Sequence, residues 1–159
     1  MNNKIIMKAS RDADTRSAEG EVTKKQLLQN SVSHIEDVQN VGNWLADKFK
    51  EQIKEHDWTK IEYIDKFHQD FNDVKQDETK SFKDMEWFQL HINEERHHLN
   101  DRCPDDVNLL DVLEMVVDCC CAGLARSGNI YPIEISQEII QKAIDNTKQM
   151  IIDNTEVVE

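Results

Sequence analysis

Residues 106–127 read DVNLLDVLEMVVDCCCAGLARS, and this stretch decides the fold. Apart from three acids it is apolar on nearly every side, which predicts a helix at the centre of the protein. The acids Asp111, Glu114 and Asp118 follow one another at spacings of three and four residues, so they share one helical face. We expect Asp111 and Glu114 to lie near the solvent end. Asp118 stands among valines and cysteines, where a carboxylate is costly unless it has a partner.

The rest of the chain is also predicted to be helical. Four Gly and two Pro in 159 residues are too few for a turn-rich β-sandwich. Apolar residues recur at three- and four-residue spacing, which predicts helices over 31–54, 58–74, 82–98 and 135–153, with a short helical turn around KKQLLQ before the first. We expect Asp105 or Asp106 to cap the central helix. The sequence therefore predicts an all-α bundle of about five to six helices over residues 22–159, preceded by a loosely ordered arm at 1–21.

Composition narrows the function. The formal net charge of −13 argues against a protein that binds the DNA or RNA backbone in general, because such proteins neutralise phosphates with clustered Lys and Arg. No apolar run approaches the ~20 residues of a membrane span, and no signal-peptide pattern is visible, so we expect a soluble cytoplasmic protein. The four cysteines contain no CxxC pair, and they fit best as small core residues in a reducing compartment.

The histidines are concentrated in a way that indicates a metal centre. Three of the six lie in HINEERHHLN at residues 91–100, where two helical turns separate His91 from His98. Another, His56, stands beside Asp57, whose two carboxylate oxygens can face different ions. Imidazole and carboxylate donors suit Mn, Fe, Zn, Co or Ni, with Mg less suited to so many nitrogens. The pattern predicts one or two divalent ions, with these candidate ligands: His34, His56, Asp57, His91, His97, His98 and Asp118.

The order H…HD…H…HH…D resembles the HD-domain superfamily, named for its His-Asp pair, in which a helical bundle binds one to three divalent metals. The fragments HDWTK and ERHHLNDRCPDDVNLLDVLEMVVDCCCAG are also similar to a group of small HD-like proteins from phages and bacteria. The resemblance covers residues 31–125. It implies that His34, His56, Asp57 and Asp118 hold a first ion. It also implies that Asp57 bridges to a second ion, held by His91 with His97 or His98.

The resemblance implies a metal-dependent phosphohydrolase or phosphodiesterase that acts on a nucleotide or a related small phosphorylated molecule. Asp57 and Lys60 are the expected catalytic residues, and Lys60, Arg96 and Arg126 are the candidates to hold a phosphate. A phage-encoded protein of this kind would act in the host cytoplasm.

Two other functions stay open. The same ligands suit a di-iron oxygenase of the HD type, and the acidity suits a non-catalytic protein that mimics nucleic acid or sequesters a nucleotide. The last predicted helix can pack on the bundle or on another chain, so a homodimer is also open.

Overall fold

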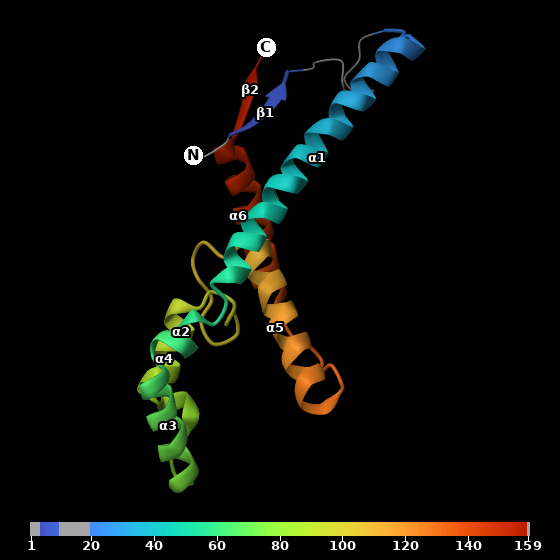
Figure 1. Cartoon of the computed structure of the whole chain (residues 1–159). Helices are drawn as coiled ribbons and strands as arrows, with labels where there is room; N and C mark the ends of the chain where they lie inside the picture. Colours follow the sequence, from blue (N-terminus) through green and yellow to red (C-terminus); the bar gives the residue numbers. More distant parts are fainter. Residues whose placement is uncertain (1–3, 10–19, 159) are drawn as a thin grey trace. The chain divides into compact units, whose positions relative to one another are not determined.

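The computed structural model describes residues 4–9 and 20–158, and it confirms the all-α prediction. Helices make up most of the described chain, and two short strands form the rest of its regular structure (Figure 1). None of the described helices combines the length and hydropathy that a membrane span requires. The elements, in chain order, are β1 (Ile5–Lys8), α1 (Lys24–Lys54), α2 (Trp58–Glu62), α3 (Ile64–Gln76), the 3₁₀-helix η1 (Phe82–Asp84), α4 (Glu86–Glu94), α5 (Leu109–Ser127), α6 (Gln137–Asn154) and β2 (Thr155–Val158).

The chain divides into two compact units, one made of Met1–Glu51 with Lys148–Glu159 and the other of Gln52–Thr147. In the first unit, β1 pairs with β2 in parallel, from Ile5 opposite Thr155 to Lys8 opposite Val158 (Figure 1). β1 falls within the arm that we expected to be loosely ordered, while positions 1–3 and 10–19 of that arm lie outside the described residues. The short helical turn expected near KKQLLQ is the beginning of α1 itself.

In the second unit, α2, α3, η1 and α4 contact one another around an aromatic cluster. The single helix predicted over 58–74 is two helices, because the backbone leaves helical geometry at Tyr63 (φ −110°, ψ 35°). Phe67 on α3 stacks on Trp87 of α4, with ring centroids 3.9 Å apart. The buried carboxylate of Asp70 accepts a hydrogen bond from the Trp87 backbone N–H at 2.8 Å. This bond satisfies a free N–H at the start of α4 and fixes α3 against α4.

The helix predicted over 82–98 was wrong at its end, since α4 stops at Glu94. Glu95 has an extended backbone (φ −92°, ψ 112°), and its buried carboxylate accepts hydrogen bonds from the backbone N–H groups of Asp57 and Thr59. These contacts tie Glu95 to the beginning of α2, which favours departure from the helix at this residue. His97 and His98 therefore lie in a turn after α4 and not on it.

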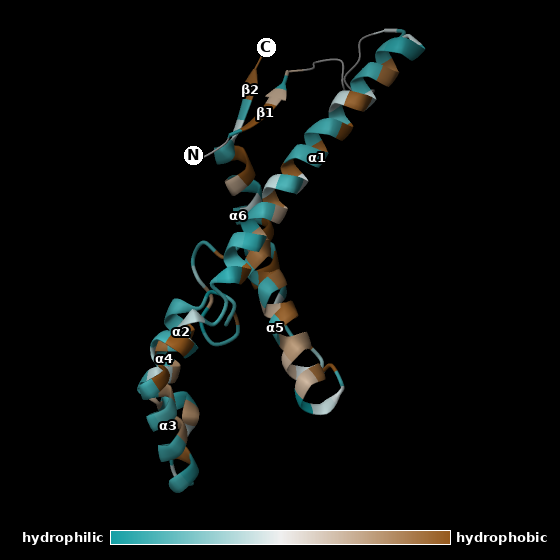
Figure 2. Cartoon of the chain, viewed as in Figure 1, coloured by the Kyte–Doolittle hydropathy of each residue, from teal (hydrophilic) through white to brown (hydrophobic). Residues whose placement is uncertain are grey.

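The central helix α5 begins later than predicted. Its N-cap is Asn108 and neither Asp105 nor Asp106, and Asn108 forms a capping box with Asp111. The helix ends at Gly128 in the left-handed conformation (φ 71°), which suits glycine. Figure 2 shows the apolar character of the second half of α5, which contains the cysteines. The core around α5 consists of Leu99, Val107, Met115 and Ala143, with Cys103 and Cys119 packed against it.

Candidate metal centre

The centre is built around Asp57, at the turn between α1 and α2. Its backbone is left-handed (φ 57°), a conformation that Asp tolerates better than most residues. The Asp57 N–H donates to Glu95 Oε2 at 3.2 Å, which helps to hold this turn. The side chain of Asp57 is only 17% exposed. The turn thus places the Asp57 carboxylate among His56 of the same turn, His91 of α4, and His97 and His98 of the turn after α4.

The two oxygens of Asp57 face different partners. Oδ2 lies 3.3 Å from His56 Nε2 and also contacts the Lys60 ammonium. Oδ1 lies 3.5 Å from His91 Nε2 and 3.7 Å from His97 Nε2, and it is buried without a hydrogen-bond partner among the described residues. Each oxygen of Asp57 therefore lies beside different histidine nitrogens.

Three groups of side chains in this unit could hold a metal ion, each with donor atoms within 4.8 Å of one another. Two of them share Asp57, and the groups are His56 with Asp57 and Asp118, Asp57 with His91 and His98, and His56 with His97 and Glu114. The first group contains three of the four residues expected at the first ion and lacks His34. The second contains Asp57 and His91 with His98, one of the two alternatives for the second ion, and His97 belongs to the third group.

Hydrogen bonds fix the tautomer of His91. The Thr59 hydroxyl donates to Glu95 Oε1 at 2.7 Å, so its oxygen is left to accept the proton of His91 Nδ1 at 2.6 Å. The lone pair of His91 is therefore on Nε2, which faces Asp57 Oδ1 and lies 2.8 Å from His98 Nε2. Burial, with the neighbouring His98, lowers the pKa of His91 to about 3, so this ring stays neutral. A neutral imidazole held by its other nitrogen is the state in which histidine binds a metal.

Glu114 orients two further histidines. Its Oε1 accepts from His56 Nδ1 at 2.8 Å and lies 3.3 Å from His97 Nδ1, close enough for an ion pair but without an aligned hydrogen bond. Burial alone would raise the pKa of Glu114, but the contact with His97 and the hydrogen bonds from His56 and Gln52 lower it to about 2. Burial would likewise lower the pKa of His97, and the Glu114 carboxylate raises it instead. With Nδ1 of both rings on Glu114, both Nε2 atoms lie within 3.7 Å of Asp57.

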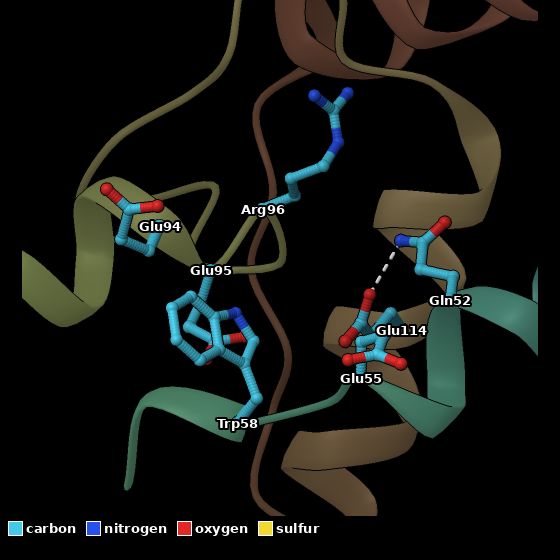
Figure 3. A pocket seen from close by; sticks show the side chains of 7 residues that line it. All are labelled: Gln52, Glu55, Trp58, Glu94, Glu95, Arg96 and Glu114. Atoms are coloured by element: carbon cyan, nitrogen blue, oxygen red, sulfur yellow. Dashed lines mark hydrogen bonds between the residues drawn. The ribbon is translucent and has the colours of Figure 1, made fainter. Parts of the chain in front are cut away.

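The expectation that Asp111 and Glu114 lie near solvent was wrong, because both are buried. Partners on other segments make this burial tolerable. Gln52 Nε2 donates to Glu114 Oε2 at 2.6 Å and to Asp111 Oδ1 at 3.0 Å, and Figure 3 shows the first of these contacts. Arg96 forms a bidentate salt bridge with Asp111, in which Nε donates to Oδ1 and Nη2 donates to Oδ2, both at 2.9 Å. A chain of hydrogen bonds thus runs from Arg96 through Asp111, Gln52 and Glu114 to His56.

Arg96 is therefore engaged within the protein, although the sequence suggested it as a phosphate ligand. It also binds Asp106 through Nη1 at 3.0 Å. In Figure 3 its guanidinium extends away from Glu95, although both residues line the same pocket. We assign it to support of the centre. Lys60 and Arg126, the other two phosphate candidates, both line a pocket whose wall also includes Asp118 and His98.

His34 belongs to the first unit and is exposed on α1, where it lines a pocket with Met7, Val38 and Leu45. The three groups that could hold a metal are formed without it. Asp118 lies 3.7 Å from His56 Nε2 and is about one third exposed, less enclosed than its apolar neighbours suggested.

Sequence reasoning missed the residues that orient the ligands, namely Gln52, Thr59, Glu95, Asp111 and Glu114. One signal was available, because Glu114 precedes Asp118 by one helical turn on the face that carries the ligand. No sequence signal pointed to Thr59 or Glu95, because the contact between them depends on where α4 ends.

Together, the fold and the centre define a helical protein with a buried histidine–carboxylate cluster that could hold divalent metal ions. A family model described as a family of unknown function (DUF5662) matches residues 23–156, so the chain belongs to that family. No curated protein and no solved structure matches the chain.

Proposed function

We propose that the protein is a metal-dependent phosphohydrolase or phosphodiesterase of the HD type that acts on a small phosphorylated molecule. The observation that carries the proposal is the position of Asp57, whose two oxygens face different histidines. Bridging carboxylates of this kind are a feature of two-metal hydrolytic sites.

The side chains suit divalent ions in chemistry as well as in position. Asp57 Oδ1 and both ring nitrogens of His97 are buried without hydrogen-bond partners among the described residues, which is costly unless something else binds them. The donors are imidazole nitrogens and carboxylate oxygens, a set that suits Mn, Fe, Zn, Co or Ni. Bound there, such ions would polarise a phosphoryl oxygen and supply hydroxide from water near neutral pH.

The chain's own residues keep the centre ready for substrate. Burial alone would raise the pKa of Asp57, but the hydrogen bond and the charge of the Lys60 ammonium keep it below its usual value, so Asp57 stays ionised. Lys60 is about two-fifths exposed, and its ammonium can exchange part of its contact with Asp57 for a substrate phosphate. Glu114 and Thr59 hold the ring orientations that turn lone pairs toward Asp57.

A di-iron oxygenase is the second candidate, and the high share of nitrogen donors favours it. The four imidazoles of His56, His91, His97 and His98 outnumber the three carboxylates of the groups, Asp57, Glu114 and Asp118, and imidazole suits iron well.

The test is a calorimetric titration of metal-stripped protein with Mn²⁺ and with Fe²⁺, beside Asp57→Asn. Asn tolerates the left-handed backbone at this position, so the variant removes the charge with little strain. The matched control is Asp65→Asn, an exposed acid in the first turn of α3.

We expect the wild type and Asp65→Asn to bind metal and release phosphate from a panel of phosphate esters, and Asp57→Asn to lose both. Oxygen consumption with Fe²⁺ and no phosphate release would favour the oxygenase. Equal metal binding by all three proteins would overturn both functions and favour a non-catalytic acidic binding protein.

A further inference from the structure

Two cavities adjoin the centre and share part of their walls. One has a volume of about 370 Å³ and is lined by Asp118, Tyr131 and residues of α5. The other, of about 280 Å³, is lined largely by aromatic residues of α3, η1 and α4. Lys60, His98 and Arg126 line both cavities. Any molecule bound at these three residues can therefore extend into either cavity.

The shared wall suits an anion. Arg126 is exposed in the last turn of α5, and no ion-pair partner is found for it among residues 4–9 and 20–158. Lys60 reaches the same wall, and its contact is with Asp57. The chain as a whole is acidic, with a formal net charge of −13, but this wall carries the two positive charges of Lys60 and Arg126. A phosphate group complements them, because Arg binds its oxygens in a fork and Lys binds as a point charge.

The aromatic cavity suits a flat ring. Its walls include Phe71, which is 47% exposed, and the partly buried Phe82 and Phe88. Behind them Trp87 is held between Phe67 and His91, with ring centroids 3.9 Å and 4.7 Å away. A volume of about 280 Å³ lies just below the ~300–1,000 Å³ of ligand pockets, so the cavity suits a small group such as one ring system.

The indole N–H of Trp87 is a second observation in favour of a ring bound in this cavity. Trp87 lines this cavity, and its Nε1 is buried without an acceptor among the described residues. A buried donor without a partner is uncommon in a native protein. A ring that carries an acceptor atom would remove that cost.

We propose that the substrate is a phosphate ester joined through a short linker to a planar aromatic ring. The phosphate binds at Lys60 and Arg126 beside His98, and the ring stacks in the cavity lined by Phe71 and Phe88. This inference rests on the proposed function and deepens it. The ring is either a nucleobase or a simple aryl group, since both share this chemistry.

The experiment measures binding to the full chain in Mn²⁺ by calorimetry. The probes are phosphonate analogues of adenosine monophosphate and ribose 5-phosphate, together with benzylphosphonate, because a P–C bond resists hydrolysis. Stacking of one base on aromatic side chains contributes ~1–3 kcal/mol, so we expect the adenosine analogue to bind about 5- to 150-fold tighter than the ribose analogue. Benzylphosphonate as tight as the adenosine analogue would identify a simple aryl ring as sufficient, and weaker binding would identify a nucleobase.

Two variants locate the ring. Phe71→Leu keeps an apolar side chain and should bring the ratio of the two dissociation constants close to one, with the ribose analogue unaffected. Tyr131→Leu, in the other cavity, is the matched control and should leave the ratio unchanged. Arg126→Gln should weaken both analogues by a similar factor.

Equal affinities of the adenosine and ribose analogues, or a ratio that falls in Tyr131→Leu instead, would overturn the inference, as would no binding of any probe. The proposed function would survive that result if Asp57→Asn still abolished phosphate release. Ring-selective binding without any hydrolysis would have the opposite meaning: the assigned phosphate and ring sites would stand as a ligand site, and the hydrolase, with the ligand as its substrate, would be refuted.

Discussion

Substitution of Glu114 by Gln should weaken metal binding although Glu114 need not touch the ion. The variant keeps the shape of the side chain but removes the charge that Oε1 offers to His56 at 2.8 Å and to His97 at 3.3 Å. The new amide also places a donor or a weaker acceptor opposite the Gln52 amide, which now donates to Oε2 at 2.6 Å. The contacts at Nδ1 that orient the rings of His56 and His97, with Nε2 toward Asp57, are then weaker.

The size of the effect follows from one charged hydrogen bond. A hydrogen bond to a charged group contributes ~1.5–3 kcal/mol and a neutral one ~0.5–1.5 kcal/mol. The difference for the His56 contact alone is therefore about 1–1.5 kcal/mol, and the weaker charge effect on His97 adds to it. We expect Mn²⁺ to bind about 10- to 100-fold more weakly, the usual range when a residue behind a metal ligand is replaced.

The assay is calorimetric titration of metal-stripped protein with Mn²⁺, with urea unfolding of the metal-free protein to show that the variant folds. The control is Glu55→Gln, the same chemical change at an exposed residue in the wall of the same pocket (Figure 3). A folded Glu114→Gln protein that binds Mn²⁺ within twofold of the wild type would refute the reasoning.

Three further predictions concern the residues that support the centre. Arg96→Lys should lower the free energy of unfolding by about 1.5–3 kcal/mol in urea titration, because Lys cannot replace the two-bond grip on the buried Asp111. Thr59→Val should lower it by roughly 1–3 kcal/mol and should also weaken metal binding, because the hydroxyl that holds His91 Nδ1 is lost. The stability of the metal-free protein should fall as the pH drops from 4.5 toward 2, by about 3 kcal/mol at most. The reason is that the pKa of Glu114 is 4.5 when unfolded and about 2 when folded, so the unfolded chain takes up the proton first.

Each of these has its own control. A Thr59→Ser variant keeps the hydroxyl and should bind metal as the wild type does, whereas equal losses in Val and Ser would remove the hydroxyl from the argument. Glu114→Gln should flatten the acid part of the stability curve, and an unchanged slope would assign it to other carboxylates. Arg96→Lys with normal stability and a raised KM for substrate would restore Arg96 as a phosphate ligand.

The helices could be predicted from the sequence because each depends on a local pattern of apolar residues. The apolar spacing predicted the ends of α1, α5 and α6 to within three residues at all but one boundary, the start of α1. The end of α4 could not be predicted, because the pattern in HINEERHH is compatible with a continuing helix. The helix ends where Glu95 contacts Thr59, a residue 36 positions earlier in the chain. β1 was missed for a similar reason, because its partner β2 lies at the other end of the chain.

The candidate ligands could be chosen by residue type, but the residues that orient them could not. Histidine is rare in this chain, so a group of three was conspicuous, whereas Glu and Asp number 32 and no single carboxylate stands out. Glu114 was placed near solvent because an acid on a helix usually lies there. Its burial is explained by Gln52, His56 and His97, none of which is near it in sequence.

The early end of α4 also resolves a difficulty in the sequence pattern. On one continuous helix His91 and His97 lie six residues apart and face different directions, so a single carboxylate oxygen could not meet both. Because the chain turns at Glu95, His97 returns to within 3.7 Å of Asp57 Oδ1, the atom that His91 approaches from α4 at 3.5 Å. The carboxylate of Glu95 binds the turn of Asp57 itself. One residue therefore ends the helix, holds the turn that carries Asp57 and, through Thr59, sets the tautomer of His91, so its loss should disturb all three at once.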